Sequence, residues 1–456
     1  MNNIAKRSRI AIILVGVLLA GLGVYFVTFL FRASDWMTTE GNPYVYSGTN
    51  VTSGIVLDRQ GTVLQDSTNG RVYAESELLR KSTLHILGDR SGYINAPFLD
   101  SYADEVLGYN VLNGVYSTSD EPGTVRLTIS GEVQKTALNA LNGKAGVVAV
   151  YNYKTGEILC AVTSPTYDPD NKPSDVETNP AYSGVYVNRL TQSTYTPGSI
   201  FKVFTTAVAL ETIPGIEDMT FTCTGSYSFG YDQVTCEKAH GEVSLTKALQ
   251  KSCNCAYAQI AMLLGADTLN EYAQKYSIME PVTFDGVTTA RGSFDVSGTE
   301  DVNVAWGAIG QYTDTINPLR YLQFMGQIAG GGKGAVPYLV AEITSGGNRT
   351  YSAQTEQTSR ILSTQAALQL HELMRANVVN IYGDYHFAGL TACAKSGTAQ
   401  AGGGKAATAT FAGFTTDEEY PLAFIVIVEE GGYGSDTCVP ILSKVLTACK
   451  EAMDQK

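Results

Sequence analysis

Histidine is scarce in this sequence, and its scarcity argues against metal-dependent enzymes. Only four histidines occur, and none lies in a metal-ligand spacing such as HExxH. We therefore expect no metal and no cofactor in the functional site. Basic residues are also outnumbered, because 31 lysines and arginines face 44 acidic residues and leave a net charge of −13. That balance argues against a nucleic-acid partner. Repeats and low-complexity tracts are absent too, and 44% hydrophobic residues indicate a globular chain.

Charge is missing altogether from residues 10–31 near the N-terminus. As a helix this run is about 33 Å long, which matches the hydrocarbon core of a membrane. Lys6, Arg7 and Arg9 precede it, so the positive-inside rule places residues 1–9 in the cytoplasm and the rest of the chain outside. A cleaved signal peptide is the alternative, but the run is longer than a usual h-region and no A-x-A site follows it. We expect a single-pass protein of the cell membrane with an extracytoplasmic catalytic domain.

The eight cysteines must be interpreted for an exported chain, in which disulfides can form. Cys223 and Cys236 flank one turn-rich segment and are the best candidate pair, although spacing alone fixes no connectivity. A zinc site on this pair would lack two further ligands. Cys253, Cys255 and Cys393 lie within or beside the motifs described next, and we expect them to be small packing residues.

Three short motifs follow one another along the chain, and each has a second copy elsewhere. The second copies fit ordinary structural roles. Ser244 is well placed as a helix N-cap, Lys154-Thr-Gly156 is the loop of a hairpin, and Ser67-Thr-Asn69 precedes a glycine in a turn. The three motifs that remain are Ser199-Ile-Phe-Lys202, Ser252-Cys-Asn254 and Lys395-Ser-Gly-Thr398.

The first motif supplies a nucleophile and a base. Ser199 and Lys202 are three residues apart at the start of a predicted helix, so their side chains share a face. A serine hydroxyl is inert until a base takes its proton. Lys202 can be that base only if its pKa falls by roughly 3 units, which burial and the positive end of the helix both favour. An exposed pair on an ordinary helix is the alternative. The Pro-Gly before Ser199 and the apolar run after it favour the catalytic interpretation.

The other two motifs supply groups that handle a proton and an anion. Ser252 would relay a proton between the lysine and a leaving amine, and Asn254 would hold a substrate amide. Lys395, with the hydroxyls of Ser396 and Thr398, would bind a carboxylate. Gly397 would let a substrate backbone approach an edge strand. The backbone N–H groups of Ser199 and Thr398 would form an oxyanion hole.

The rest of the chain predicts an α+β fold, in which an antiparallel sheet is flanked by helices from both ends of the sequence. Residues 146–162 predict a hairpin with a glycine turn, three extended runs occupy residues 391–428, and a helix closes the chain at 439–453. We divide the chain into a cytoplasmic tail, a membrane anchor, a linker, a small N-terminal module and a catalytic domain. Their ranges are 1–9, 10–31, 32–53, 54–135 and 136–456.

These motifs and their surroundings resemble the class B penicillin-binding proteins, which are membrane-anchored D,D-transpeptidases of bacterial cell-wall synthesis. The segments Gly54-Ile-Val-Leu-Asp-Arg-Gln-Gly and Ser164-Pro-Thr-Tyr-Asp-Pro, together with Gly310-Gln311, fit the family as well. The resemblance implies the penicillin-binding transpeptidase fold and the cross-linking of peptidoglycan stem peptides ending in D-Ala-D-Ala. It also implies inhibition by β-lactams and a glycosyltransferase partner.

The resemblance assigns roles to the motif residues. It makes Ser199 the acylated nucleophile and Lys202 its base, and it matches Ser252 and Asn254 to the second motif. Lys395, Ser396, Gly397 and Thr398 match the third motif, although Ser396 stands where the family usually has threonine. The hydroxyl is kept, so substrate binding is expected to survive.

Other activities share some of these features. A D,D-carboxypeptidase differs only in using water as the acceptor. A serine β-lactamase has all three motif types, but 143 residues separate Ser252 from Lys395, and no glutamate is followed four residues later by asparagine as in class A enzymes. The class D route through a carboxylated lysine stays open. A non-catalytic sensor would need a cytoplasmic output domain, and residues 1–9 are too few for one. A pseudoenzyme would be expected to lack Lys202 or Lys395, and both are present.

Overall fold

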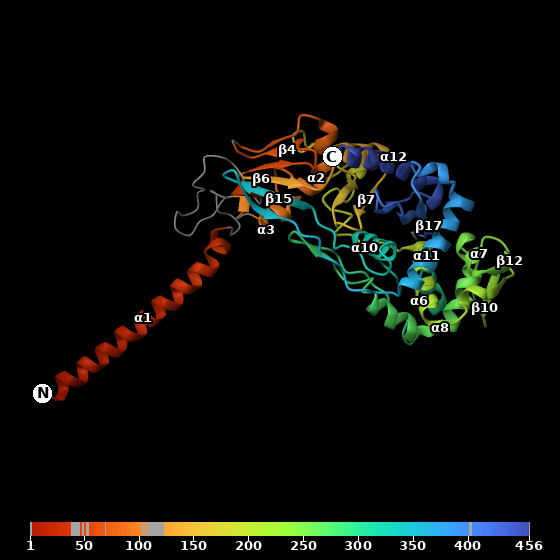
Figure 1. The fold of residues 1–456 in the computed structure, drawn as a ribbon, viewed down its shortest axis with the longest axis horizontal. Helices are drawn as coiled ribbons and strands as arrows, with labels where there is room; N and C mark the ends of the chain where they lie inside the picture. Colours follow the sequence, from red (N-terminus) through yellow and green to blue (C-terminus); the bar gives the residue numbers. More distant parts are fainter. Residues whose placement is uncertain are drawn as a thin grey trace.

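The computed structural model describes residues 2–37, 46–47, 50–51, 54–68, 70–102, 105–106, 123–400 and 404–455. Helix α1 (Asn2–Met37) extends away from a body that holds the other elements (Figure 1). Its span Ile4–Arg32 is long and apolar enough to cross a membrane, although a signal sequence would pass the same test. The linker expected at residues 32–53 lies mostly outside the described residues, and its first residues continue α1 up to Met37.

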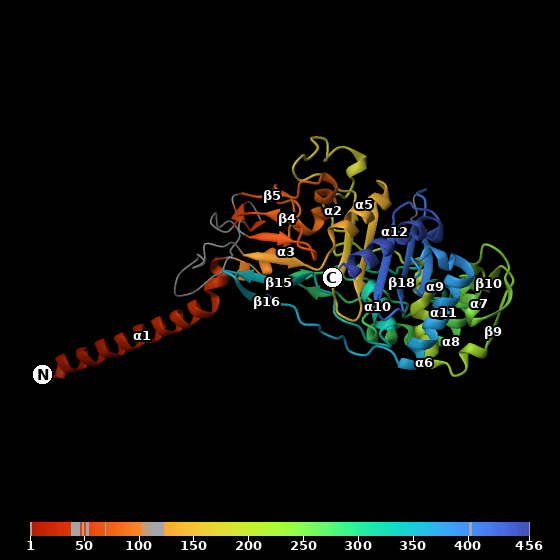
Figure 2. The same ribbon diagram turned by 45° about the horizontal axis from the view of Figure 1, so that its top comes forward.

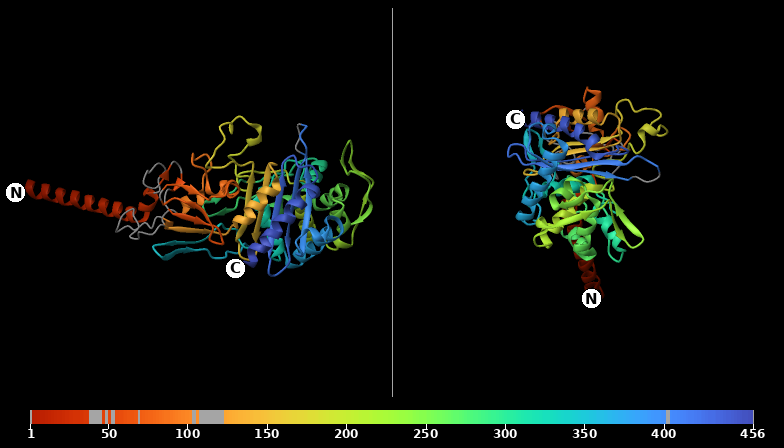
Figure 3. Two further views of the ribbon diagram at one scale, coloured as in Figure 1. Left: turned by 90° about the horizontal axis from the view of Figure 1, so that it is seen from above. Right: turned by 90° about the vertical axis from the view of Figure 1, so that its right-hand side faces the viewer.

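The central sheet joins the two parts of the sequence that were expected to form it. Its five strands run in the order β17-β18-β19-β7-β8, and every neighbouring pair is antiparallel. The predicted hairpin and the three C-terminal extended runs are thereby confirmed, and β17 lies at one edge. Figure 3 shows these early and late strands side by side. Their bounds are β7 (Gly146–Asn152), β8 (Ile158–Ser164), β17 (Ala392–Ala399), β18 (Thr408–Thr415) and β19 (Leu422–Val428).

Side chains alternate across this sheet between two cores, as a period of two requires. In β19, Ala423, Ile425 and Ile427 belong to one core, whereas Leu422, Phe424, Val426 and Val428 belong to the other. Helices α5 (Gly131–Leu141) and α12 (Gly434–Asp454) cover the second face, with α12 lying along β18 (Figure 2). The first face is covered by α10 (Pro318–Ala329) and α11 (Thr364–Asn377). Helix α6 (Lys202–Thr212) packs against α11, and α8 (Asn254–Lys275) packs against α6 in the same core. The sheet is therefore buried between helices on both sides, which confirms the predicted fold class.

A second sheet lies nearer to α1 and has the order β16-β15-β6-β3-β4-β5. Four of its strands come from the predicted N-terminal module, and two come from residues 340–352. Strands β15 and β16, from late in the sequence, thus complete a sheet that begins in the N-terminal module. The expected domain boundary near residue 135 stays a prediction. The strands are β3 (Ile55–Leu57), β4 (Val63–Asp66), β5 (Val72–Tyr73), β6 (Thr124–Leu127), β15 (Val340–Ser345) and β16 (Asn348–Ser352). The predicted N-terminal module also contains the helices α2 (Glu77–Leu87) and α3 (Pro97–Ser101).

A small lobe lies at the end of the body farthest from α1 (Figure 1). Strand β9 (Thr220–Cys223) pairs with β12 (Gly241–Ser244), and β10 (Ser226–Phe229) pairs with β11 (Asp232–Thr235). Helix α7 (Leu245–Gln250) follows, and Ser244 caps it by accepting from the N–H of Lys247. The N-cap interpretation of Ser244 is confirmed. Lys154-Thr-Gly156 is the β7–β8 turn, as expected, whereas Asn69 of the remaining second copy lies outside the described residues.

The disulfide predicted between Cys223 and Cys236 is wrong, because both cysteines are free in the structure. Cys223 pairs in register with Gly241 of β12. The Sγ atom of Cys236 instead lies 3.8 Å from that of Cys253 and 3.5 Å from that of Cys255, at the start of α8. The packing of the β10–β11 hairpin on α8 therefore determines which sulfur atoms lie close together. Sequence spacing alone did not reveal these contacts.

The remaining elements are short, and two of them, η2 and η4, carry residues of the site described below. They are β1 (Tyr46–Ser47), β2 (Asn50–Val51), β13 (Thr283–Phe284), β14 (Val287–Thr288), α9 (Asp301–Ile309), and the helical turns η1 (Pro180–Tyr182), η2 (Gly198–Phe201), η3 (Ile216–Asp218), η4 (Val378–Tyr382) and η5 (Asp384–His386).

Candidate active site

Ser199 lies in the turn η2, which leads directly into α6. Pro197 begins this turn, and Gly198 has a positive φ of 60° that favours glycine. A Cβ atom on Gly198 would also lie only 2.9 Å from the carbonyl oxygen of Thr398. The Pro-Gly pair that marked the motif in the sequence thus sets the turn and lets it pack against β17.

Lys202 is buried completely and lies among the polar groups of two motifs. Its Nζ atom is 3.0 Å from Ser199 Oγ, 3.1 Å from Ser252 Oγ, 2.9 Å from the Ser252 carbonyl oxygen and 2.7 Å from Asn254 Oδ1. The structure therefore brings together the first and second motifs, which lie 50 residues apart in the chain.

Burial lowers the pKa of Lys202 from 10.5 to about 7, because a charged amine loses its hydration there. A neutral amine has two N–H donors and one lone pair. The carbonyl oxygen of Ser252 and Oδ1 of Asn254 can only accept, so they can take both donors. The lone pair is then left for the hydroxyl proton of Ser199 or Ser252. This is the hydrogen-bonding state that a general base requires.

Ser252 and Asn254 occupy the tight connection between α7 and α8. Ser252 has a φ of 49°, an uncommon value for a residue with a side chain, and Asn254 is the first residue of α8. The Nδ2 atom of Asn254 donates to the carbonyl oxygen of Thr235, 2.7 Å away, which fixes the orientation of the amide. Asn254 therefore presents its oxygen to Lys202 and its nitrogen to the small lobe.

Lys395, Ser396, Gly397 and Thr398 lie on the edge strand β17, as the sequence indicated. Lys395 is buried, and its Nζ donates to the carbonyl oxygen of Ser396 over 2.6 Å. Burial, and then the charge of the nearby Lys202, lower the pKa of Lys395 well below its usual value. The third motif thus lies within electrostatic range of the first.

Gly397 is required by the packing of β17 on the turn that bears Ser199. A Cβ atom at this position would lie 2.9 Å from the carbonyl oxygen of Pro197 and 2.9 Å from the backbone nitrogen of Ile200. It would also lie 2.3 Å from Oγ1 of Thr410, the hydroxyl that donates to Pro197. The missing side chain therefore leaves room for η2, a reason different from the substrate approach expected from the sequence.

Two side chains support the third motif without having been singled out as site residues. The hydroxyl of Tyr382 is 3.0 Å from Ser396 Oγ and accepts from the Ser396 N–H over 2.9 Å. Nε2 of Gln311 donates to the carbonyl oxygen of Thr398 over 3.1 Å. Tyr382 lies in a turn with no recognisable motif, so the sequence carried no signal for it. Gln311 had been noted only as a family feature.

The described site residues thus form one constellation, in which a serine hydroxyl contacts a buried amine beside an edge strand. The hydrogen bonds between these described residues involve no carboxylate and no histidine. This arrangement is the one that a serine acyl-transferase needs if a lysine takes the place that histidine has in a Ser-His-Asp triad.

Comparison with known proteins narrows that class to a family. The family described as "Penicillin binding protein transpeptidase domain" matches residues 146–447. The peptidoglycan D,D-transpeptidase PbpA of Mycolicibacterium smegmatis is 30% identical over 341 residues, which cover 68% of each chain. Its counterpart in Mycobacterium tuberculosis is 29% identical over 364 residues.

Solved structures agree with this similarity. The ceftriaxone acyl-enzyme complex of penicillin-binding protein A from M. tuberculosis superposes with a TM-score of 0.75 at 25% identity, covering 87% of this chain and 98% of that one. A D,D-transpeptidase domain from Eggerthella lenta has the same fold, with a TM-score of 0.76 at 24% identity, and covers 89% and 99%. The chain therefore belongs to the penicillin-binding protein transpeptidases.

Proposed function

We propose that this protein is a peptidoglycan D,D-transpeptidase that acts through an ester on Ser199. The observation that carries the proposal is the contact of Ser199 Oγ with the buried Nζ of Lys202, at 3.0 Å. The names of the curated relatives and the acyl-enzyme structure of the mycobacterial homologue support the same reaction.

The first half of the reaction forms the ester. Lys202 Nζ takes the proton of Ser199 Oγ as that oxygen attacks the carbonyl carbon of the penultimate D-alanine. The N–H groups of Ser199 and Thr398 hold the oxyanion. Ser252, which is 3.1 Å from Lys202 Nζ, passes the proton to the departing D-alanine amine as the peptide bond breaks.

The second half transfers the acyl group. The amine of a neighbouring stem peptide attacks the ester, its proton passes to Lys202 by way of Ser252, and the bond to Ser199 Oγ breaks. Lys395, Ser396 and Thr398 bind the terminal carboxylate of the donor. That anion favours the charged form of Lys395, because an opposite charge raises the pKa of an amine. A glycosyltransferase partner would supply the glycan strands that are to be cross-linked.

Acyl transfer must be distinguished from hydrolysis. With a peptide thioester as donor and a D-amino acid as acceptor, we expect transfer to exceed hydrolysis. We also expect a β-lactam adduct that persists for minutes, because no carboxylate takes part in the hydrogen bonds of the described site, where it could activate a water. Sustained nitrocefin hydrolysis above about one turnover per second would make the protein a β-lactamase. Hydrolysis of the thioester without transfer would indicate a carboxypeptidase.

A further inference from the structure

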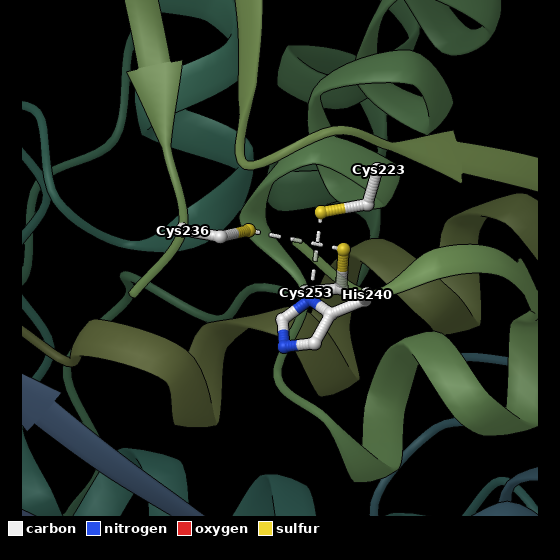
Figure 4. A group of neighbouring side chains, drawn as sticks. All are labelled: Cys223, Cys236, His240 and Cys253. Atoms are coloured by element: carbon white, nitrogen blue, oxygen red, sulfur yellow. Dashed lines mark hydrogen bonds between the residues drawn. The ribbon is translucent and has the colours of Figure 1, made fainter. Parts of the chain in front are cut away.

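Three cysteines and a histidine converge in the small lobe beside the active site. Cys223 ends β9, Cys236 follows β11, His240 precedes β12, and Cys253 caps the N-terminus of α8. One ligand atom from each residue lies within 4.8 Å of all the others. Figure 4 shows the three sulfur atoms and the imidazole ring turned toward a common centre.

Two of the distances within this cluster match those of a tetrahedral metal site. Four ligands around zinc, with Zn–S bonds of about 2.3 Å and Zn–N bonds of about 2.0 Å, leave sulfurs about 3.8 Å apart and a sulfur about 3.5 Å from a nitrogen. In the structure, Sγ of Cys236 is 3.8 Å from Sγ of Cys253. Sγ of Cys223 is 3.5 Å from Nδ1 of His240. With all four ligand atoms within 4.8 Å of one another, small side-chain movements would close a tetrahedral site.

Backbone groups around the cluster suit thiolates. The N–H of Cys255 is 3.4 Å from Sγ of Cys236, and the N–H of Ala256 is 3.4 Å from Sγ of Cys253. Both donors belong to the first turn of α8, where free N–H groups and the helix dipole favour negative charge. Metal-bound sulfurs usually receive such outer hydrogen bonds, which hold the ligands in place.

We propose that Cys223, Cys236, His240 and Cys253 bind one structural Zn²⁺ ion. Three thiolates and a neutral imidazole fill all four positions, so no position remains for water and the ion is not catalytic. Binding releases the three thiol protons to solvent and leaves the cluster with one negative charge. The low histidine count had argued against a metal, but three of the four ligands are cysteines.

The ion would connect the small lobe to the second catalytic motif. Cys253 lies between Ser252 and Asn254, and Cys236 follows Thr235, whose carbonyl oxygen accepts from Asn254 Nδ2 over 2.7 Å. Oδ1 of the same asparagine is 2.7 Å from Nζ of Lys202. A metal that holds residues 236 and 253 together thus fixes the amide that contacts the catalytic base. The four ligands are positioning residues for that contact.

Metal content is the first test. The full-length chain should be purified in detergent without chelators and measured by inductively coupled plasma mass spectrometry, with thiols mapped under non-reducing conditions. We expect one zinc per chain and no disulfide among residues 223, 236, 253 and 255. A zinc-free chain, with these cysteines reduced or joined in disulfides, would overturn the proposal.

Matched variants then test the ligand set. His240→Ala should lose bound zinc, whereas His240→Cys should retain it, because a thiolate can replace the imidazole. Cys255→Ser should also retain zinc: Sγ of Cys255 lies 3.5 Å from that of Cys236 but is outside the proposed ligand set, and its backbone N–H is kept. Loss of zinc from Cys255→Ser as complete as that from Cys253→Ser, or full zinc in His240→Ala, would contradict the assignment. Replacement of zinc by Co²⁺ in the wild-type chain should give thiolate-to-cobalt charge-transfer absorption, and its absence would also count against the site.

The positioning role has its own readout. Wild-type and His240→Cys chains should be acylated by penicillin at similar rates, and His240→Ala roughly tenfold more slowly, because small displacements of catalytic groups are costly. A His240→Ala chain that lacks zinc and is acylated at the wild-type rate would overturn the positioning role.

Discussion

At the scale of single residues, the proposed reaction depends on the protonation state of Lys202. Its amine must be neutral to accept the proton of Ser199, and burial lowers its pKa to about 7. The neutral form therefore predominates above pH 7 and is lost as the pH falls. A lysine with its ordinary pKa of 10.5 would be almost wholly charged, and inactive as a base, at neutral pH.

We predict that acylation by penicillin accelerates as the pH rises through 7. The second-order rate constant for acylation should rise roughly tenfold per pH unit below pH 6 and level off above about pH 8. Stopped-flow measurements with a fluorescent penicillin from about pH 5 to about pH 9 check this directly. A rate constant that stays flat over the range, or falls as the pH rises, would show that Lys202 is not the base.

Tyr382 offers a second test at this scale. Its hydroxyl contacts both Oγ and the N–H of Ser396, and burial raises its pKa, so it stays a neutral donor. Tyr382→Phe removes both hydrogen bonds, and about 0.5–1.5 kcal/mol for such a bond corresponds to a roughly two- to tenfold loss of acylation efficiency. Tyr385→Phe is the control, because Tyr385 lies in the next turn and is 82% exposed. Equal effects of the two changes would refute a specific role.

At the scale of elements, the site depends on close packing between strand β17 and turn η2. Gly397→Ala would push a methyl group against two backbone atoms that cannot move independently. We predict a loss of about 1–3 kcal/mol in the free energy of unfolding, together with slower acylation, since the turn carries Ser199. Denaturant unfolding and penicillin labelling measure the two effects. Thr408→Ala on the facing strand should change neither, and an unaffected Gly397→Ala chain would contradict the packing argument.

How much could be predicted from the sequence varies with the range of the interactions. The hairpin at 146–162, the helix after Pro197 and the C-terminal strands carry their own turn residues and apolar patterns, so local reasoning found them. Strands β15 and β16 join a sheet begun nearly 300 residues earlier, and no local pattern encodes that pairing. The three motifs were recognisable, but Tyr382 and the Cys236–Cys253 contact arise only from tertiary packing.

At the scale of the whole molecule, α1 and the small lobe lie at opposite ends of the body (Figure 1). We propose that α1 anchors the protein with residues 1–9 in the cytoplasm, since Lys6, Arg7 and Arg9 lie at the N-terminal end of the span Ile4–Arg32, before its uncharged part. The catalytic domain would then face the cell wall.

We predict that protease added to intact spheroplasts removes the body of the protein and spares residues 1–9. The same treatment of permeabilised cells, which exposes both sides of the membrane, serves as the control. The mature protein should also retain Met1 or Asn2. Protection of the body in intact spheroplasts would reverse the orientation, and an N-terminus beyond Arg32 would show that α1 is a cleaved signal.

The identity of the nucleophile tests the central claim most directly. Intact-mass and peptide mass spectrometry of the full-length chain after exposure to penicillin should show a single adduct, on Ser199, that persists for minutes. Ser199→Ala should show none while its circular dichroism and unfolding transition stay those of the wild type. An adduct that survives in Ser199→Ala, or one that maps to Ser244 in the wild-type chain, would contradict the account.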